Sequence, residues 1–259
     1  MPKPYVDMII RTRAETSDWA YGARFLQSLC QYGDLLVPEQ MSHNYDRFSG
    51  KELEPFVGIA EAEKKWAVDS SRSYDGVFVK NYEYFAWRRR KNLKCLGWIA
   101  HKFVNAKGSL SPGHIDFTSE YSNKVEWLSL FKDWCKIFPV QLGLLHYFRE
   151  AKPYFREPDS EYDEPDIRLG SCLNPIPSDA GWAMFYGDEF TDKVDDAKIE
   201  AAGFPIEKIG NGSLVRVTEN MEDVANNFET FSKLRMELRK LFPENFFLVD
   251  HPTPEDNQD

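Results

Sequence analysis

The chain has 259 residues, of which 42% are apolar, a size and composition that predict a globular protein with one large core or two smaller ones. Its 42 acidic residues outnumber its 32 basic ones, and the resulting net charge of −10 argues against a protein that grips nucleic acid through its own phosphate contacts. No segment approaches the roughly 20 apolar residues of a membrane span, and the apolar run at residues 8–10 is too short for a secretory signal, so we expect a cytoplasmic protein.

The first part of the chain predicts a strand followed by an amphipathic helix. Residues 5–11 form the apolar run of the strand, and residues 16–32 place Trp19 on an apolar helix face. Gly33 then ends the helix. A second, shorter helical pattern reaches Trp66.

A hairpin and an aromatic–basic run follow. Asp75-Gly76 is typical of a tight turn, and residues 77–79 continue as a strand. The aromatic residues of 82–87 precede four basic ones at 88–91, a combination also found on platforms that bind single-stranded nucleic acid. The net negative charge of the chain favours the other interpretation, in which a strand ends in a solvated basic turn before the next strand.

Two stretches share one plan and predict an internal duplication. Residues 113–148 and residues 210–250 both read as strand, helix, proline stop and strand, with Pro139 and Pro243 at matching places. A helix between two strands favours a crossover that lays the helix on one face of the sheet. Chance similarity between two α/β segments is the alternative.

These elements predict an α/β (α+β) fold with two similar halves, in which helices pack on mixed β-sheets. The predicted N-terminal half covers residues 1–150, and the predicted C-terminal half covers residues 181–259. Residues 151–180 are rich in proline and acid and predict a linker or loop.

The strongest functional signal is negative charge in two places. Residues 157–166 hold six acids around Tyr162, and five more acids, Asp188, Glu189, Asp192, Asp195 and Asp196, follow the predicted strand at 181–187. Such a segment is either a solvated loop or an arm that enters a basic cleft in place of nucleic-acid phosphates. The predicted partner contacts, with three aromatic anchors among them, are Tyr154, Phe155, Glu157, Asp159, Glu161, Tyr162, Asp163, Glu164, Asp166, Asp188 and Glu189.

Catalytic and metal-binding motifs give little support to an enzyme. The sequence contains no HExxH, CxxC or G-x-S-x-G pattern, and Gly210-Asn211-Gly212 reads as a turn rather than a phosphate loop. Asp188 and Glu189 are the best candidates for a hard cation, but adjacent acids usually diverge. We therefore expect no catalytic residue, no cofactor and no metal, although catalytic groups can converge from distant positions.

Scattered Gly and Trp residues carry a family resemblance: Trp19 in the first helix, Gly97-Trp98 and Gly181-Trp182 in strands, and the sequence IEKIGNG at residues 206–212. In this order the chain resembles the immunity proteins of bacterial polymorphic-toxin and type VI secretion systems, and most nearly the immunity protein 52 family. The resemblance implies a cytoplasmic, non-enzymatic protein that binds and blocks a cognate toxin, commonly a nuclease with a restriction-endonuclease-like fold.

The resulting hypothesis is an immunity protein that occludes the active site or the substrate cleft of a basic nuclease effector, without direct contact to nucleic acid or membrane. Two other classes stay open. One is an enzyme that acts on a small or nucleotide substrate in a cleft between the halves. The other is a non-catalytic adaptor domain, whose partner would have no activity to inhibit.

Overall fold

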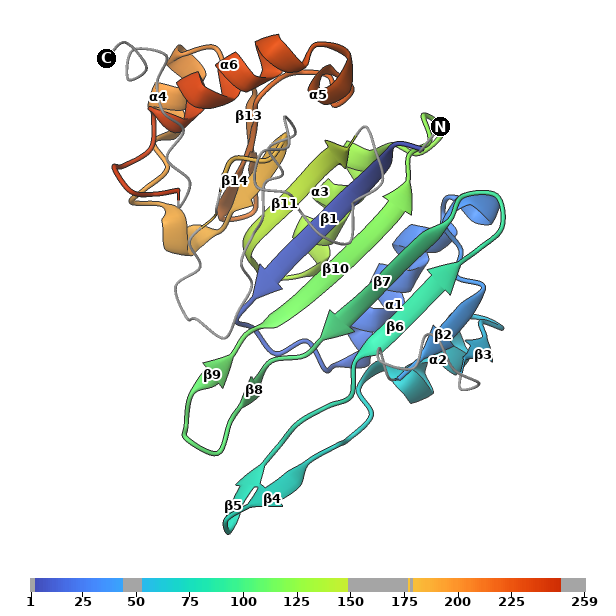
Figure 1. The fold of residues 1–259 in the computed structure, drawn as a ribbon. Coiled ribbons are helices and arrows are strands. Elements are labelled where there is room, and N and C mark those ends of the chain that lie inside the picture. Colours follow the sequence, from blue (N-terminus) through green and yellow to red (C-terminus); the bar gives the residue numbers. More distant parts are fainter. Residues whose placement is uncertain (1–2, 44–52, 149–176, 178, 248–259) are drawn as a thin grey trace, which may run out of the picture.

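The computed structural model describes residues 3–43, 53–148, 177 and 179–247. Within these residues, most strands join one large sheet, and Figure 1 shows helices next to it. The strands of this sheet are β1 Tyr5–Thr12, β2 Gln40–Ser42, β3 Glu54–Pro55, β6 Phe85–Arg89, β7 Cys95–Ala100, β10 Gly113–Glu120, β11 Val140–Phe148, β12 Ala183–Tyr186, β13 Ile206–Ile209 and β14 Gly212–Arg216.

Two separate hairpins and the helices complete the described fold. The hairpins are β4 Arg72–Tyr74 with β5 Val77–Val79, and β8 Phe103–Val104 with β9 Leu110–Ser111. The helices are α1 Trp19–Cys30, α2 Ile59–Trp66, α3 Trp127–Ile137, α4 Asp196–Ala201, α5 Asp223–Asn226 and α6 Phe228–Arg239, with 3-10 turns η1 Gly33–Leu35 and η3 Asp188–Phe190. The predicted α+β class is confirmed. No described helix has both the length and the apolar content needed to cross a bilayer.

The large sheet has ten strands in the order β13-β14-β12-β11-β1-β10-β7-β6-β2-β3. All of its described pairings are antiparallel. The predicted boundary between the halves falls between β11 and β12, and these two strands pair with each other in the same sheet. The predicted linker at 151–180 lies outside the described residues, apart from Pro177, Asp179 and Ala180.

Strand β1 is the centre of the sheet. It pairs along its length with β10 on one side and with β11 on the other, and all of its residues except Ile9 are buried. Because β10 and β11 are both antiparallel to β1, they run parallel to each other, and α3 connects them as a crossover. The strand–helix–strand unit predicted at residues 113–148 is therefore confirmed.

The later copy departs from this plan. Its helical region divides at Asn227, whose non-helical backbone (φ −144°, ψ 50°) separates α5 from α6. After Pro243, the left-handed residue Asn245 (φ 59°) turns the chain, so that Phe246 and Phe247 are buried in a turn and not in the predicted strand. The prediction is wrong for these two residues, and the rest of that predicted strand lies outside the described residues.

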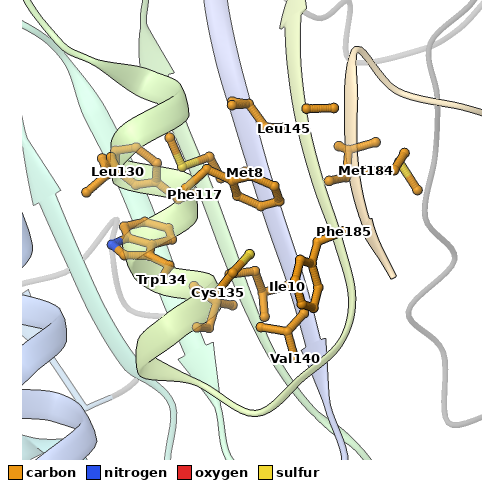
Figure 2. Close-up of a cluster of buried hydrophobic side chains, with 14 of the residues drawn as sticks. Met8, Ile10, Phe117, Leu130, Trp134, Cys135, Val140, Leu145, Met184 and Phe185 are labelled. Carbon is orange, nitrogen blue, oxygen red and sulfur yellow. The ribbon is translucent and has the colours of Figure 1, made fainter. Parts of the chain in front are cut away.

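Helices α1, α2 and α3 lie behind strands β1, β6, β7 and β10 in the view of Figure 1. Figure 2 shows Leu130 and Trp134 of α3 close to Met8 and Phe117 of the sheet. Further along this core, the Phe25 ring of α1 lies 4.9 Å from the ring of Trp87 and 4.9 Å from that of Trp134. Aromatic side chains thus fill the layer between helices and sheet, as the aromatic content of 15% leads one to expect.

Both outer strands of the large sheet carry features that hinder further pairing. Strand β3, at one edge, has only two residues and ends in Pro55. Strand β13, at the other edge, exposes Glu207 and Lys208 in its middle. Glu207 pairs with Lys132 of α3, and Lys208 pairs with Asp196 of α4.

A buried ion group fixes α6 to the segment before β12. The carboxylate of Asp179 lies 3.3 Å from the guanidinium of Arg235 and 3.1 Å from that of Arg239. The side chains of Asp179 and Arg235 are only 3% and 1% exposed. The Asp179 carboxylate therefore bridges two arginines, and its loss would remove two ion pairs from a buried site.

We expect Asp179→Asn to lower the free energy of unfolding by about 3–5 kcal/mol, because it removes the anion from a buried ion group. Urea unfolding measures this loss. The matched control is Glu61→Gln, which removes an exposed salt bridge to Lys64 and should cost less than about 0.5 kcal/mol. Equal effects of the two substitutions would contradict the role assigned to Asp179.

Candidate interaction surface

Most of the predicted partner contacts lie outside the described residues. These are Tyr154, Phe155, Glu157, Asp159, Glu161, Tyr162, Asp163, Glu164 and Asp166, all within 149–176. Their role in binding stays a prediction.

The other two, Asp188 and Glu189, open the turn η3 directly after β12, at the end of the strand where the sequence places them. The Glu189 carboxylate accepts hydrogen bonds of 2.6 Å from Arg13 Nη1 and from Gln141 Nε2. Its charge is therefore offset by Arg13. Asp188 is exposed, and its backbone carbonyl accepts a hydrogen bond from the hydroxyl of Thr191. Both residues of the pair are exposed, and the Glu189 side chain stays 37% exposed while it pairs with Arg13.

A cleft of about 520 Å³ lies beside this pair. It is lined from the N-terminal part by Arg13 and Gln141 and from the C-terminal part by Glu189 and the turn at residues 210–212. That turn joins β13 to β14 with Gly210 in a left-handed conformation (φ 57°), as the sequence predicts. Within the described residues, no group of three or more His, Cys, Asp or Glu side chains could hold a metal ion.

The unusual feature of the described surface is its exposed apolar side chains. Large hydrophobic side chains normally avoid water, and a gathering of them marks an interaction site. Those that are exposed are Val57, Tyr74, Val77, Phe78, Tyr84, Leu96 and Val104. Four of these seven belong to the two small hairpins, which project side by side beyond the end of the sheet (Figure 1). We call these hairpins the two arms.

The first arm, β4–β5, turns at Asp75 and Gly76, which both have positive φ (48° and 79°). This confirms the predicted tight turn, because two left-handed residues match the twist of a hairpin. Tyr74 pairs with Val77, and Ser73 pairs with Phe78. Since side chains alternate along a strand, Tyr74 and Val77 share one face of the arm and Phe78, 71% exposed, lies on the other.

The second arm, β8–β9, is closed by the side chain of Asn105. Its Oδ1 accepts hydrogen bonds from the backbone N–H groups of Lys107 (2.9 Å) and Ser109 (3.0 Å). Gly108 supplies the left-handed residue (φ 78°) that the turn requires. The turn therefore holds its shape without a core, and Val104 beside it stays half exposed.

Between the two arms lies a groove of about 640 Å³. Its lining comes from both arms and from the chain that joins the first arm to β6, and it combines polar, charged and aromatic side chains. The aromatic residues of the lining are Tyr74, Tyr82, Tyr84 and Phe103. The charged ones are Arg72, Glu83 and Lys107. We call this feature the inter-arm groove.

A buried histidine fixes the base of both arms. His101, just before β8, receives at Nδ1 a hydrogen bond of 3.0 Å from the Thr16 hydroxyl, because its Nε2–H donates to the carbonyl oxygen of Trp66 at 2.7 Å. Its ring also meets that of Tyr82, just after β5, edge to face at 5.6 Å. Burial lowers the pKa of His101, so its ring is neutral in the fold.

The sequence analysis missed the arms as a site. It predicted the turn and the strand of the first arm, but a strand of Val, Phe and Val normally indicates burial. The only signal in the sequence is charge. Residues 68–84 and 101–112 together hold four basic and three acidic side chains, whereas the whole chain holds 32 and 42. The arms are thus a slightly positive, apolar part of an acidic protein.

Comparison with known proteins adds little. No protein-family model matches the chain, and no curated protein matches it. Among solved structures, the chain is similar to Pseudomonas aeruginosa T6SS protein PA0821, with 13% sequence identity, a TM-score of 0.46, and coverage of 83% of this chain and 68% of that one. We draw no conclusion about function from a likeness of this degree. The resemblance to the immunity protein 52 family stays a prediction.

The buried histidines predict a stability that falls with acid. Desolvation on burial, together with the nearby Arg11 guanidinium, lowers the pKa of His114 to about 4. Desolvation also lowers the pKa values of His101 and His146 below the ordinary value. A lowered folded-state pKa gives stability that is present above the unfolded pKa of about 6.5 and is lost as the pH falls below it. From pH 7.5 to 5.0, His114 alone should cost the fold about 2 kcal/mol.

Denaturant unfolding of the wild type and of His101→Gln at both pH values measures this effect. Removing the His101 ring should make the loss between pH 7.5 and 5.0 smaller, since one neutral buried histidine is gone. An unchanged loss would contradict the neutral, buried state of His101.

Proposed function

We propose that the chain is an immunity protein that binds a cognate bacterial toxin, a nuclease effector, and neutralises it by covering its active site or substrate cleft. The observation that carries this proposal is the exposure of Tyr74, Val77, Phe78 and Val104 on the two arms. Aromatic side chains that become buried on binding supply much of the energy of protein interfaces. Such a surface supports a protein partner.

The charge of the chain supports a basic partner. A net charge of −10 attracts a positively charged domain, such as one that cleaves nucleic acid, and speeds its association. The exposed carboxylate of Asp188 and the predicted acidic contacts at 157–166 would face that domain. Glu189 would contribute less, because Arg13 already pairs with it.

One observation favours a second candidate function. The cleft beside Glu189 lies where β11 begins and β12 ends, at the junction of the two predicted halves, and Arg13, Gln141 and Glu189 converge there. An enzyme with two halves would hold a small substrate in such a place. Turnover of a nucleotide or other small molecule that is lost in Glu189→Gln would support this enzyme class. A bound partner with no activity to inhibit would support the adaptor class instead.

The direct test is co-expression with the product of the neighbouring gene, followed by co-purification, titration calorimetry and a DNA-cleavage assay. A nanomolar complex in which cleavage is abolished is the expected result. Failure to form a complex, or a complex in which the nuclease still cuts, would refute the proposal.

Phe78→Ala should weaken that complex by at least about tenfold, because truncating a central aromatic anchor costs roughly 2 kcal/mol or more. The matched control is Val57→Ala, since Val57 is 73% exposed, close to the 71% of Phe78, and lies next to the edge strand β3 away from the arms. Titration calorimetry compares the two. If both substitutions leave the affinity unchanged, the arms are not the contact surface.

A further inference from the structure

We infer that the inter-arm groove receives one segment of the partner, an apolar stretch flanked by acidic side chains. This inference rests on the proposed function and adds to it the chemistry of one contact. The lining residues and their charges carry it.

The cations at this groove are available for a partner. Arg72 comes from the first arm and Lys107 from the second, so that positive charge reaches the groove from both walls. Neither side chain forms a hydrogen bond or an ion pair with the described part of the chain. Glu83 is the one acid in the lining. An incoming carboxylate would therefore gain a charge-assisted partner without displacing an existing ion pair.

A third cation lies near the groove. The ammonium of Lys80 sits 5.3 Å from the centre of the Tyr82 ring, and Tyr82 lines the groove. The ring holds this positive charge against the aromatic wall by a cation–π interaction. Aromatic rings and cations thus occur together in and beside the groove, which matches a segment that is apolar in its middle and acidic at its ends.

The register of the first arm fixes which side chains face the occupant. Arg72 and Tyr74 are two residues apart in β4, so they lie on one face, and both line the groove with Val79, the partner of Arg72. Phe78 lies on the opposite face and does not line it. The groove and the Phe78 surface are therefore separate contacts that separate substitutions can test.

Single-stranded nucleic acid is the competing occupant, because aromatic rings next to cations also bind stacked bases. The net charge of −10 opposes a long phosphate backbone, whereas a protein segment with a few acids is repelled far less. The charge balance favours the protein segment. It also implies a partner with two signs of charge, basic where it meets the acidic surface and acidic where it enters the groove.

Three labelled probes of equal length test this inference by fluorescence anisotropy with the full chain: a peptide of Phe and Leu flanked by Glu, the same peptide with Lys in place of Glu, and oligo-dT. The Glu peptide should bind best. Arg72→Glu with Lys107→Glu should weaken it about tenfold or more, because reversed charges repel it. The control pair, Lys91→Glu with Lys124→Glu, changes the charge equally at exposed sites away from the groove and should have little effect.

Tighter binding of the Lys peptide or of oligo-dT would overturn the inference. So would an affinity for the Glu peptide that does not change in the Arg72→Glu, Lys107→Glu variant. The same variants are then tested for neutralisation of the nuclease. If the nuclease is still neutralised while the Glu peptide fails to bind, binding of a partner segment in the groove is refuted and the proposed function stays intact. The Glu peptide can also bind as expected while the chain forms no complex with the product of the neighbouring gene. That result supports the inferred role of the groove and refutes the proposed function.

Discussion

The fold depends on the complete burial of one strand. Strand β1 is hydrogen-bonded along both edges, and its side chains are buried on both faces except for Ile9. A slip of one residue would move Met8 and Ile10 out of the layer beneath α3, so the register of β10 and β11 is set by the pattern of β1. The remaining strands add outward from this trio in both directions. Every surface feature, including both arms, is positioned by that central register.

Local patterns predicted local structure well. The apolar periodicity located α1 and α3, and the pair Asp75-Gly76 located the turn of the first arm, because these signals act over a few residues. The order of ten strands could not be read in this way, since it depends on pairings between distant segments. The break at Asn227 and the turn at Asn245 also escaped prediction. Apolar periodicity continues through Asn227, and Phe246 and Phe247 read as a buried strand, so that only the backbone conformation of each asparagine reveals the change of direction.

The candidate site shows the same division between local and distant information. Counting charges in the sequence identifies Glu189 as a free acid. Its partner Arg13 lies 176 residues away in the sequence but next to it in the fold, where it offsets the negative charge. The run of Val77 and Phe78 reads as an ordinary buried strand, because nothing in the sequence says whether another layer will cover it. Only the projection of the first arm beyond the sheet leaves these side chains in water. The exposed apolar surface is thus a property of the topology.

The two ends of the large sheet restrict how any partner can attach. Pro55 has no N–H to offer to an additional strand, and the charged pair Glu207 and Lys208 occupies the opposite edge together with its ion partners. Backbone augmentation is therefore hindered at both ends, and so is stacking of one sheet onto the next into a fibre. At the large sheet, recognition of another protein therefore falls to side chains rather than to backbone pairing.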